Sequence, residues 1–130
     1  MNATAELTVE TADRVDVVDI TDGVAGALPD DHDGLATVFV RHTTAGVAIN
    51  EAEPRLLDDV ERFVATLAPR GEWDHDELDG NAAAHLRSML LGRDATLPVA
   101  GGAPDLGTWQ SVLLVECDGP RERTVGVYPH

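Results

Sequence analysis

The chain has little or none of several features that would place it in a specialised class. Its 130 residues include one cysteine, Cys117, which excludes an intrachain disulfide framework and a cysteine-rich zinc cluster. No stretch reaches the roughly 18 consecutive apolar residues that a membrane-spanning helix needs. Residues 1–10 lack the basic and apolar regions of a signal peptide. We therefore expect a cytoplasmic protein with no membrane partner.

Positive charge is scarce as well. There are 24 acidic residues against 9 basic ones, all of them arginine, so the formal net charge is −15. Nucleic-acid binding requires clustered positive charge, so we expect no nucleic-acid partner. Asp outnumbers Glu by 15 to 9, and aromatic residues make up only 4%. This composition favours a halophilic source, where an acidic surface keeps protein in solution in strong salt. An ordinary acidic protein from a GC-rich genome is the alternative.

The remaining composition is that of a globular chain, and its length suits one domain over residues 1–130. Apolar runs predict strands at residues 6–9, 14–20, 35–40, 46–50, 96–99, 108–116 and 123–127. The last two strands are expected to form a hairpin through a turn at 118–120. Apolar spacings of three and four predict helices that end near residues 28, 67 and 91.

The helix boundaries follow from residues with known positional preferences. Thr21 or Asp22 is expected to cap the short first helix. The second runs from Pro54 to Leu67, and the third from Asn81, with Gly92 as its stop. Residues 30–34 and 101–104 are predicted turns, and 72–80 is predicted to be irregular. Because strands and helices do not alternate strictly, the sequence predicts an α+β fold with a mixed sheet.

Three of the five histidines lie where functional groups tend to gather. His42 closes a predicted strand and precedes a small, polar run. Asn81, His85 and Ser88 share one face of the third helix, as expected for the wall of a pocket. His75 precedes that helix and can fold over the same pocket. No spacing here is a metal signature by itself.

Two further segments contribute candidates. Glu51 lies between a strand and a helix, where it is a general base, a metal ligand or an acid favoured by the helix dipole. Trp109 either stacks on a flat ligand or packs in the core. Gln110 either faces solvent or binds a ligand. Cys117 is expected to be packed and inert.

Three ordered motifs together resemble the YjbQ-like family over nearly the whole chain. His42–Glu51 reads HTTAGVAINE and resembles that family's signature. The second motif runs from Trp73-Asp74-His75 through Gly80-Asn81 and His85 to Gly92. The third is Leu106-Gly107-Thr108-Trp109-Gln110, followed by Glu116. Trp73 stands where the family usually has tyrosine.

The resemblance implies a sheet curled into a pseudo-barrel with two to three outer helices. It also implies a homotrimer and the reaction of a secondary thiamine-phosphate synthase, which joins a pyrimidine pyrophosphate to a thiazole phosphate and releases pyrophosphate. The family's polar site residues fall here on His42, Glu51, His75, Asn81, His85, Trp109 and Gln110.

Three functions remain open at this point. In a transferase, His42, Glu51 and His85 are the catalytic candidates, and Thr43, Asn81, Ser88, Trp109 and Gln110 are the substrate-binding ones. In a metal-dependent hydrolase of a small phosphorylated compound, His42, His75 and His85 form an open three-histidine site. A divalent metal, zinc or magnesium, is thus a candidate cofactor. The third function is non-catalytic binding of a small metabolite.

Overall fold

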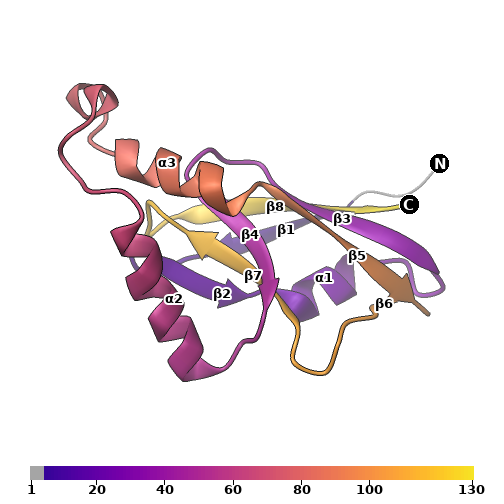
Figure 1. The fold of residues 1–130 in the computed structure, drawn as a ribbon. Coiled ribbons are helices and arrows are strands. Elements are labelled where there is room, and N and C mark those ends of the chain that lie inside the picture. Colours follow the sequence, from indigo (N-terminus) through magenta and orange to yellow (C-terminus); the bar gives the residue numbers. More distant parts are fainter. Residues whose placement is uncertain (1–4) are drawn as a thin grey trace.

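The computed structural model describes residues 5–130; the first four residues of the expected domain lie outside it. Eight strands form two curled sheets, with strand orders β1-β8-β3-β5-β6 and β2-β7-β4 (Figure 1). The strands are β1 Ala5–Glu10, β2 Asp16–Asp19, β3 Gly34–Val40, β4 Ala45–Asn50, β5 Asp94–Ala100, β6 Ala103–Pro104, β7 Ser111–Glu116 and β8 Glu122–Pro129. The pairings described are all antiparallel. The α+β class and the curled sheet agree with expectation, but the predicted mixture of parallel and antiparallel strands is wrong, because each strand described pairs with antiparallel neighbours.

The apolar run of β7 is explained by burial on both of its faces. Val112 and Leu114 belong to a core cluster that fills the space between the two sheets. Leu113 and Val115 alternate with them and join a second cluster, which contains Val64 of a helix. A strand covered on both faces needs apolar residues at every position, whereas a half-buried strand needs them at every second one.

The helices cover the three-stranded sheet and close one side of the sheet interior. The α1 helix spans Thr21–Ala27, α2 spans Pro54–Thr66 and α3 spans Ala82–Leu91, and a 3₁₀ turn, η1, covers Asp74–Glu77. Figure 1 shows α2 and α3 on the side of the β2-β7-β4 sheet that faces away from the other sheet. None of these helices is both long and apolar enough to cross a bilayer.

Helix α3 approaches β4 closely because a glycine faces it. A Cβ atom on Gly46 would lie 2.8 Å from both the Gly92 carbonyl oxygen and the Leu91 Cβ. The Val47 N–H donates to the same Gly92 oxygen at 3.1 Å. Gly92 ends the helix with φ +89°, a conformation that favours glycine. The end of α3 is therefore fixed against the beginning of β4.

The predicted terminal hairpin is wrong. Strand β7 pairs with β2 and β4 on its two edges, so neither edge is free for the strand that follows it. The chain turns at 118–121 and β8 enters the other sheet, between β1 and β3. Sequence proximity favoured a hairpin. Instead, the backbone groups on both edges of β7 pair with distant strands, and β8 is buried between two strands of the other sheet.

Several boundaries also differ from expectation. Ile20 occupies the N-cap position of α1 and no side chain caps it; the Thr21 hydroxyl donates to Asp19 instead. Ala103–Pro104 is a short strand rather than part of a turn. Strand β7 begins at Ser111 and not at residue 108, because 107–110 form a turn in which Gln110 Oε1 accepts from the Gly107 N–H at 2.9 Å.

Candidate functional site

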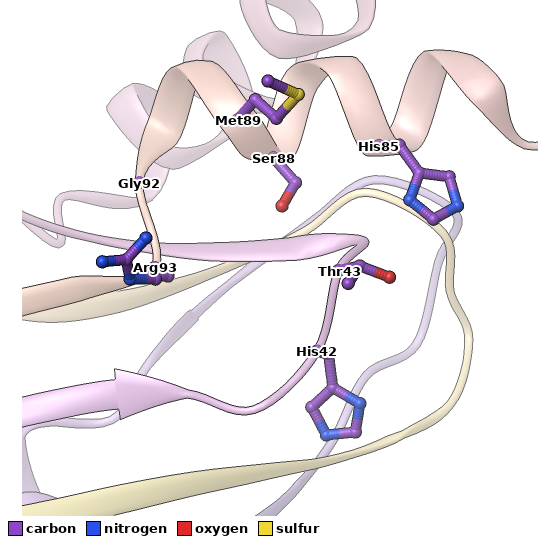
Figure 2. A pocket seen from close by; sticks show the side chains of 7 residues that line it. All are labelled: His42, Thr43, His85, Ser88, Met89, Gly92 and Arg93. Atoms are coloured by element: carbon purple, nitrogen blue, oxygen red, sulfur yellow. The ribbon is translucent and has the colours of Figure 1, made fainter.

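A cavity of about 460 Å³ lies between α3 and the connection from β3 to β4 (Figure 2). This is within the usual size range of small-molecule sites. Its lining combines the polar ends of two sequence motifs with an arginine: His42, Thr43, His85, Ser88, Met89, Gly92 and Arg93. The structure therefore brings together four of the predicted site residues.

Helix α3 supplies one wall of this pocket. His85 and Ser88 lie three residues apart and so share a face of the helix. Ser88 is buried, and its hydroxyl donates to the Ala45 carbonyl oxygen at 3.0 Å, which ties α3 to β4. The Ser88 hydroxyl thus has a structural partner, while the half-buried His85 ring remains at the pocket surface.

The opposite wall is the connection of residues 41–44. Figure 2 shows the Thr43 hydroxyl on the side of the pocket where the His85 ring lies, whereas the His42 ring points away from α3. The His42 Nε2 accepts a hydrogen bond from the Thr124 backbone N–H at 2.8 Å. A neutral imidazole that accepts at Nε2 carries its hydrogen on Nδ1.

Burial lowers the pKa of His42, and the positive charges of Arg123 and Arg121 lower it further, although Glu116 opposes them. The ring is therefore neutral near pH 7. It can offer an Nδ1–H donor to a ligand, and it cannot accept a proton at Nε2 while the Thr124 hydrogen bond persists.

His75 and His85 contact each other at the other end of the pocket wall. Their ring centroids are 4.8 Å apart in an edge-to-face arrangement. Both line a smaller cavity of about 220 Å³ with Trp73, Ala82 and Leu86. The His75 Nε2 is buried without a hydrogen-bond partner, and the nearest carboxylate oxygen, from Asp79, is 3.8 Å away. His75 thus folds over the α3 face, as the sequence predicted.

The three histidines do not fit a metal site within one chain. Across residues 5–130, no group of three His, Cys, Asp or Glu side chains is placed to hold a metal ion. A metal bound to His42 Nδ1 would leave the ring hydrogen on Nε2, where it would oppose the Thr124 N–H. His42 would have to give up that hydrogen bond to become a metal ligand.

Asn81 has a different position from the one expected for a substrate-binding residue. Its amide nitrogen donates to the Asp118 carboxylate at 2.9 Å. Asp118 also contacts Arg121 at 2.9 Å and Arg14 at 3.4 Å. Asn81 therefore links the start of α3 to the turn between β7 and β8, and it does not line the larger cavity.

Glu51 and Trp109 lie at the other end of β4. They line a separate cavity of about 300 Å³ with Ala52, Glu53, Thr108 and Ser111. The Trp109 side chain is 73% exposed, so it is not a core residue. The five steps of β4 from Ala45 to Asn50 span about 17 Å. The spacing within this one motif therefore separates Glu51 from His42 rather than joining them.

Two arginines at the pocket were missed by the sequence reasoning. Arg93 lines the larger cavity, and it shares an adjoining one of about 360 Å³ with Arg41, His42 and Thr43. Arg93 directly follows Gly92, the residue that ends α3. This position in the sequence could have predicted that Arg93 lies at the same cavity as His85. The position of Arg41 next to His42 was another. Two of the chain's nine basic residues thus flank His42 and Thr43.

The comparisons with known proteins agree on the family. The family model described as UPF0047 protein YjbQ-like matches residues 5–128. A UPF0047 protein from Archaeoglobus fulgidus is 48% identical over 121 residues, which cover 92% of this chain and 95% of the relative. The protein YugU from Bacillus subtilis is 37% identical over 124 residues, covering 91% and 92%.

Solved structures give the same result. The crystal structure of a hypothetical protein from Aeropyrum pernix superposes with a TM-score of 0.91 at 48% identity and covers 97% of both chains. A conserved hypothetical protein from Thermus thermophilus superposes with a TM-score of 0.88 at 41% identity, covering 97% of this chain and 99% of that one. The chain therefore belongs to the UPF0047 family of YjbQ-like proteins.

Proposed function

We propose that the pocket between α3 and residues 41–44 binds the pyrophosphate group of a small metabolite. The proposed reaction joins a pyrimidine pyrophosphate to a thiazole phosphate, as in a secondary thiamine-phosphate synthase. The observation that carries the proposal is the donor set: Arg93, His85 and Thr43 meet at one cavity in a chain whose net charge is −15. Guanidinium, imidazole N–H and hydroxyl groups can all donate hydrogen bonds to phosphoryl oxygens.

The reaction needs donors for a leaving group more than it needs a base. The bond between the pyrimidine methylene carbon and the pyrophosphate oxygen breaks, and its electron pair leaves on pyrophosphate. The lone pair of the thiazole ring nitrogen forms the new C–N bond, so no proton is removed from that nitrogen. Arg93, an N–H of His85 and the Nδ1–H of His42 would stabilise the charge that grows on the pyrophosphate.

Positive charge grows on the pyrimidine methylene and the thiazole nitrogen in the same step. A carboxylate favours that charge, and an exposed indole can stack on either ring. Glu51 and Trp109 have these properties, but they line the cavity at the far end of β4. They can act on a ligand in the His85 pocket only from another copy of the chain.

We therefore retain the homotrimer that the family resemblance implies. Exposed apolar side chains support it: Met89 is 79%, Trp109 73% and Leu90 71% exposed. Exposed apolar side chains that gather into a patch often mark contacts between protein chains. Trimers of His85→Ala and of Glu51→Gln, dissociated, mixed and reassembled, should recover part of the wild-type activity. Mixed trimers as inactive as their parents would contradict the shared site.

The acidic surface predicts that the trimer depends on salt. The net charge of −15 opposes association unless salt screens it. Light scattering should give the mass of three chains in strong salt and a smaller mass in dilute buffer. An unchanged mass across the salt series would contradict a trimer that depends on salt.

The activity test supplies the two substrates to the purified protein in high salt and measures pyrophosphate release. We expect His85→Ala to reduce kcat/KM by about 100-fold, the effect of losing one preorganised donor to a developing charge. Arg62→Ala is the matched control, because Arg62 lies on the exposed surface of α2 beside Asp59. Unchanged activity in a His42→Ala/His85→Ala double variant would contradict the assignment. Ligand-induced stabilisation without turnover would instead indicate a binding protein.

A metal-dependent hydrolase is the second candidate, and one observation favours it. The buried, unpartnered Nε2 of His75 lies on a ring in contact with His85, and two adjacent imidazoles are half of a zinc site. Elemental analysis of the wild type in high salt, beside His42→Ala and His85→Ala, tests it. About one metal ion per chain that is lost in both variants would support the hydrolase. Absence of metal would favour the transferase or a non-catalytic binding protein.

A further inference from the structure

A charged pair lies entirely inside the protein beside the pocket. The side chains of Arg123 and Glu116 are 1% and 0% exposed. The Arg123 Nε donates to one carboxylate oxygen at 2.8 Å, and Nη2 donates to the other. Apolar residues of similar volume often stabilise a protein as well as a buried ion pair does. Stability alone therefore does not account for this pair.

The pair is attached to the wall of the pocket. The Arg123 Nη2 also donates to Thr44, to its carbonyl oxygen at 3.1 Å and to its hydroxyl oxygen at 2.8 Å. The next residue, Thr124, donates its N–H to His42 Nε2 and accepts from the Arg41 N–H at 3.3 Å. Two adjacent residues of β8 thus hold the connection of residues 41–44 at three of its four positions.

The arginine has little freedom to turn away from this arrangement. The Thr11 hydroxyl donates to Glu116 Oε1 at 2.7 Å, and the Asp118 N–H donates to Oε2 at 3.0 Å. Each carboxylate oxygen of Glu116 therefore accepts a hydrogen bond from a group other than Arg123. The Asp118 N–H and the two Arg123 nitrogens fix this carboxylate even without the Thr11 hydroxyl, and the carboxylate sets the plane of the guanidinium and, through it, the place of Thr44.

We propose that Glu116 and Arg123 are positioning residues for the pocket. They fix residues 41–44 so that the His42 ring keeps a single tautomer, with its hydrogen on Nδ1, and so that Thr43 faces the ligand. Neither residue lines the cavity; both act through Thr44 and through the strand that carries Thr124. This proposal depends on the proposed function only for the identity of the ligand, a pyrophosphate group.

The electrostatics agree with this role. A single neutral tautomer requires that the ring stay unprotonated, and burial together with the Arg123 charge lowers the pKa of His42. Glu116 acts in the opposite direction, and its own pKa is lowered by the hydrogen bonds from Arg123, Asp118 and Thr11, although burial opposes them. Glu116 therefore stays charged and keeps Arg123 in place.

The experiment compares two threonines that bond to the same ion pair. Thr44→Val removes the hydroxyl that accepts from Arg123, on the side of the pocket. Thr11→Val removes the hydroxyl that donates to Glu116 and bonds to the Arg121 backbone, on the side away from the pocket, while the Asp118 N–H and Arg123 still hold the carboxylate. Both are buried, at 4% and 8% exposure, and the replacement has nearly the same shape. Nitrogen-15 NMR of the histidine rings reports the His42 tautomer, and calorimetry with inorganic pyrophosphate reports affinity.

We expect the wild type and Thr11→Val to show His42 with a protonated Nδ1 and a bare Nε2. Thr44→Val should show averaged ring-nitrogen shifts and bind pyrophosphate about fivefold more weakly, while Thr11→Val stays within about twofold of wild type. Identical His42 signals in the two variants would overturn the proposal. If the wild type does not bind pyrophosphate, the proposed function fails, but the NMR comparison still decides the positioning role.

Discussion

The two ends of β4 differ in almost every property that matters for a site. At its beginning, a buried ion pair, a closely packed helix and two arginines surround His42, Thr43 and His85. At its end, Glu51 and Glu53 stand beside an exposed Trp109, and the ion pair there, Glu53 with Arg55, is on the surface. In the proposed function, the first end holds an anion in a fixed geometry. The second presents negative charge and an apolar ring to the outside.

This contrast shows that one continuous motif can serve two locations. The strand carries the motif from the first cavity to the second, so residues that are close in sequence line different cavities. At the beginning of β4, the hydrogen-bond donors Thr43, His85 and Arg93 all come from a single chain. The exposed end has functional residue types without an enclosing wall, and another copy of the chain would supply one.

The largest effect should come from removing the buried cation. Arg123→Met leaves Glu116 charged and buried without its partner, which we expect to lower the free energy of unfolding by about 3–5 kcal/mol. Arg55→Ala breaks the exposed pair at the other end of β4 and should leave stability unchanged. Urea denaturation in high salt measures both. The double variant Arg123→Met/Glu116→Leu should recover much of the loss; equal stability of Arg123→Met and wild type would contradict the contrast.

A smaller effect is expected from the contact between α3 and β4. Gly46→Ala places a methyl group 2.8 Å from the Gly92 oxygen and the Leu91 Cβ, so α3 must shift, at a cost of about 1–3 kcal/mol. Gly26→Ala in α1 is the matched control, because a Cβ there meets no atom within 4 Å. Alanine should stabilise that helix slightly. Thermal unfolding of both variants gives the answer, and a Gly46→Ala protein as stable as Gly26→Ala would show that the helix is loosely packed.

The pH dependence should give the smallest effect. The folded-state pKa of His42 lies below its ordinary value of 6.5, so the unfolded chain binds the proton more tightly. The contribution of His42 to stability is therefore complete above pH 6.5 and is lost as the pH falls through the folded pKa. His42→Gln keeps an acceptor for the Thr124 N–H but does not titrate. Its free energy of unfolding should fall less than that of wild type between about pH 7 and 5.5; parallel curves would contradict a neutral His42.

Local patterns predicted most of the fold. The apolar stripe of α2, the continuous run of β7 and the stop at Gly92 each depend on neighbours in the sequence, and each is present in the structure. The pairing of β8 depends on which strand edges remain free, and no short-range signal reports that. The predicted elements are therefore largely correct, whereas the predicted partner of the last strand is not.

The site was predictable to a similar degree. A shared helix face predicted that His85 and Ser88 lie together, and His42 at the strand end lines the same cavity. The partner of His42 Nε2 is 82 residues away, and Arg123 and Glu116 act on the loop through contacts across two sheets. The residue type and helix position of Asn81 suited a substrate-binding role, but its amide nitrogen donates to the Asp118 carboxylate. Contacts of this kind are fixed by tertiary packing.

The most direct test of the central claim is calorimetric titration of inorganic pyrophosphate into the protein in high salt. We compare wild type with His85→Ala at the first end of β4 and Trp109→Ala at the second. We predict binding by wild type, a loss of about tenfold or more in affinity for His85→Ala, and a change within about twofold for Trp109→Ala. Equal effects of the two variants, or no binding by wild type, would contradict the claim that the pocket between α3 and residues 41–44 is an anion site.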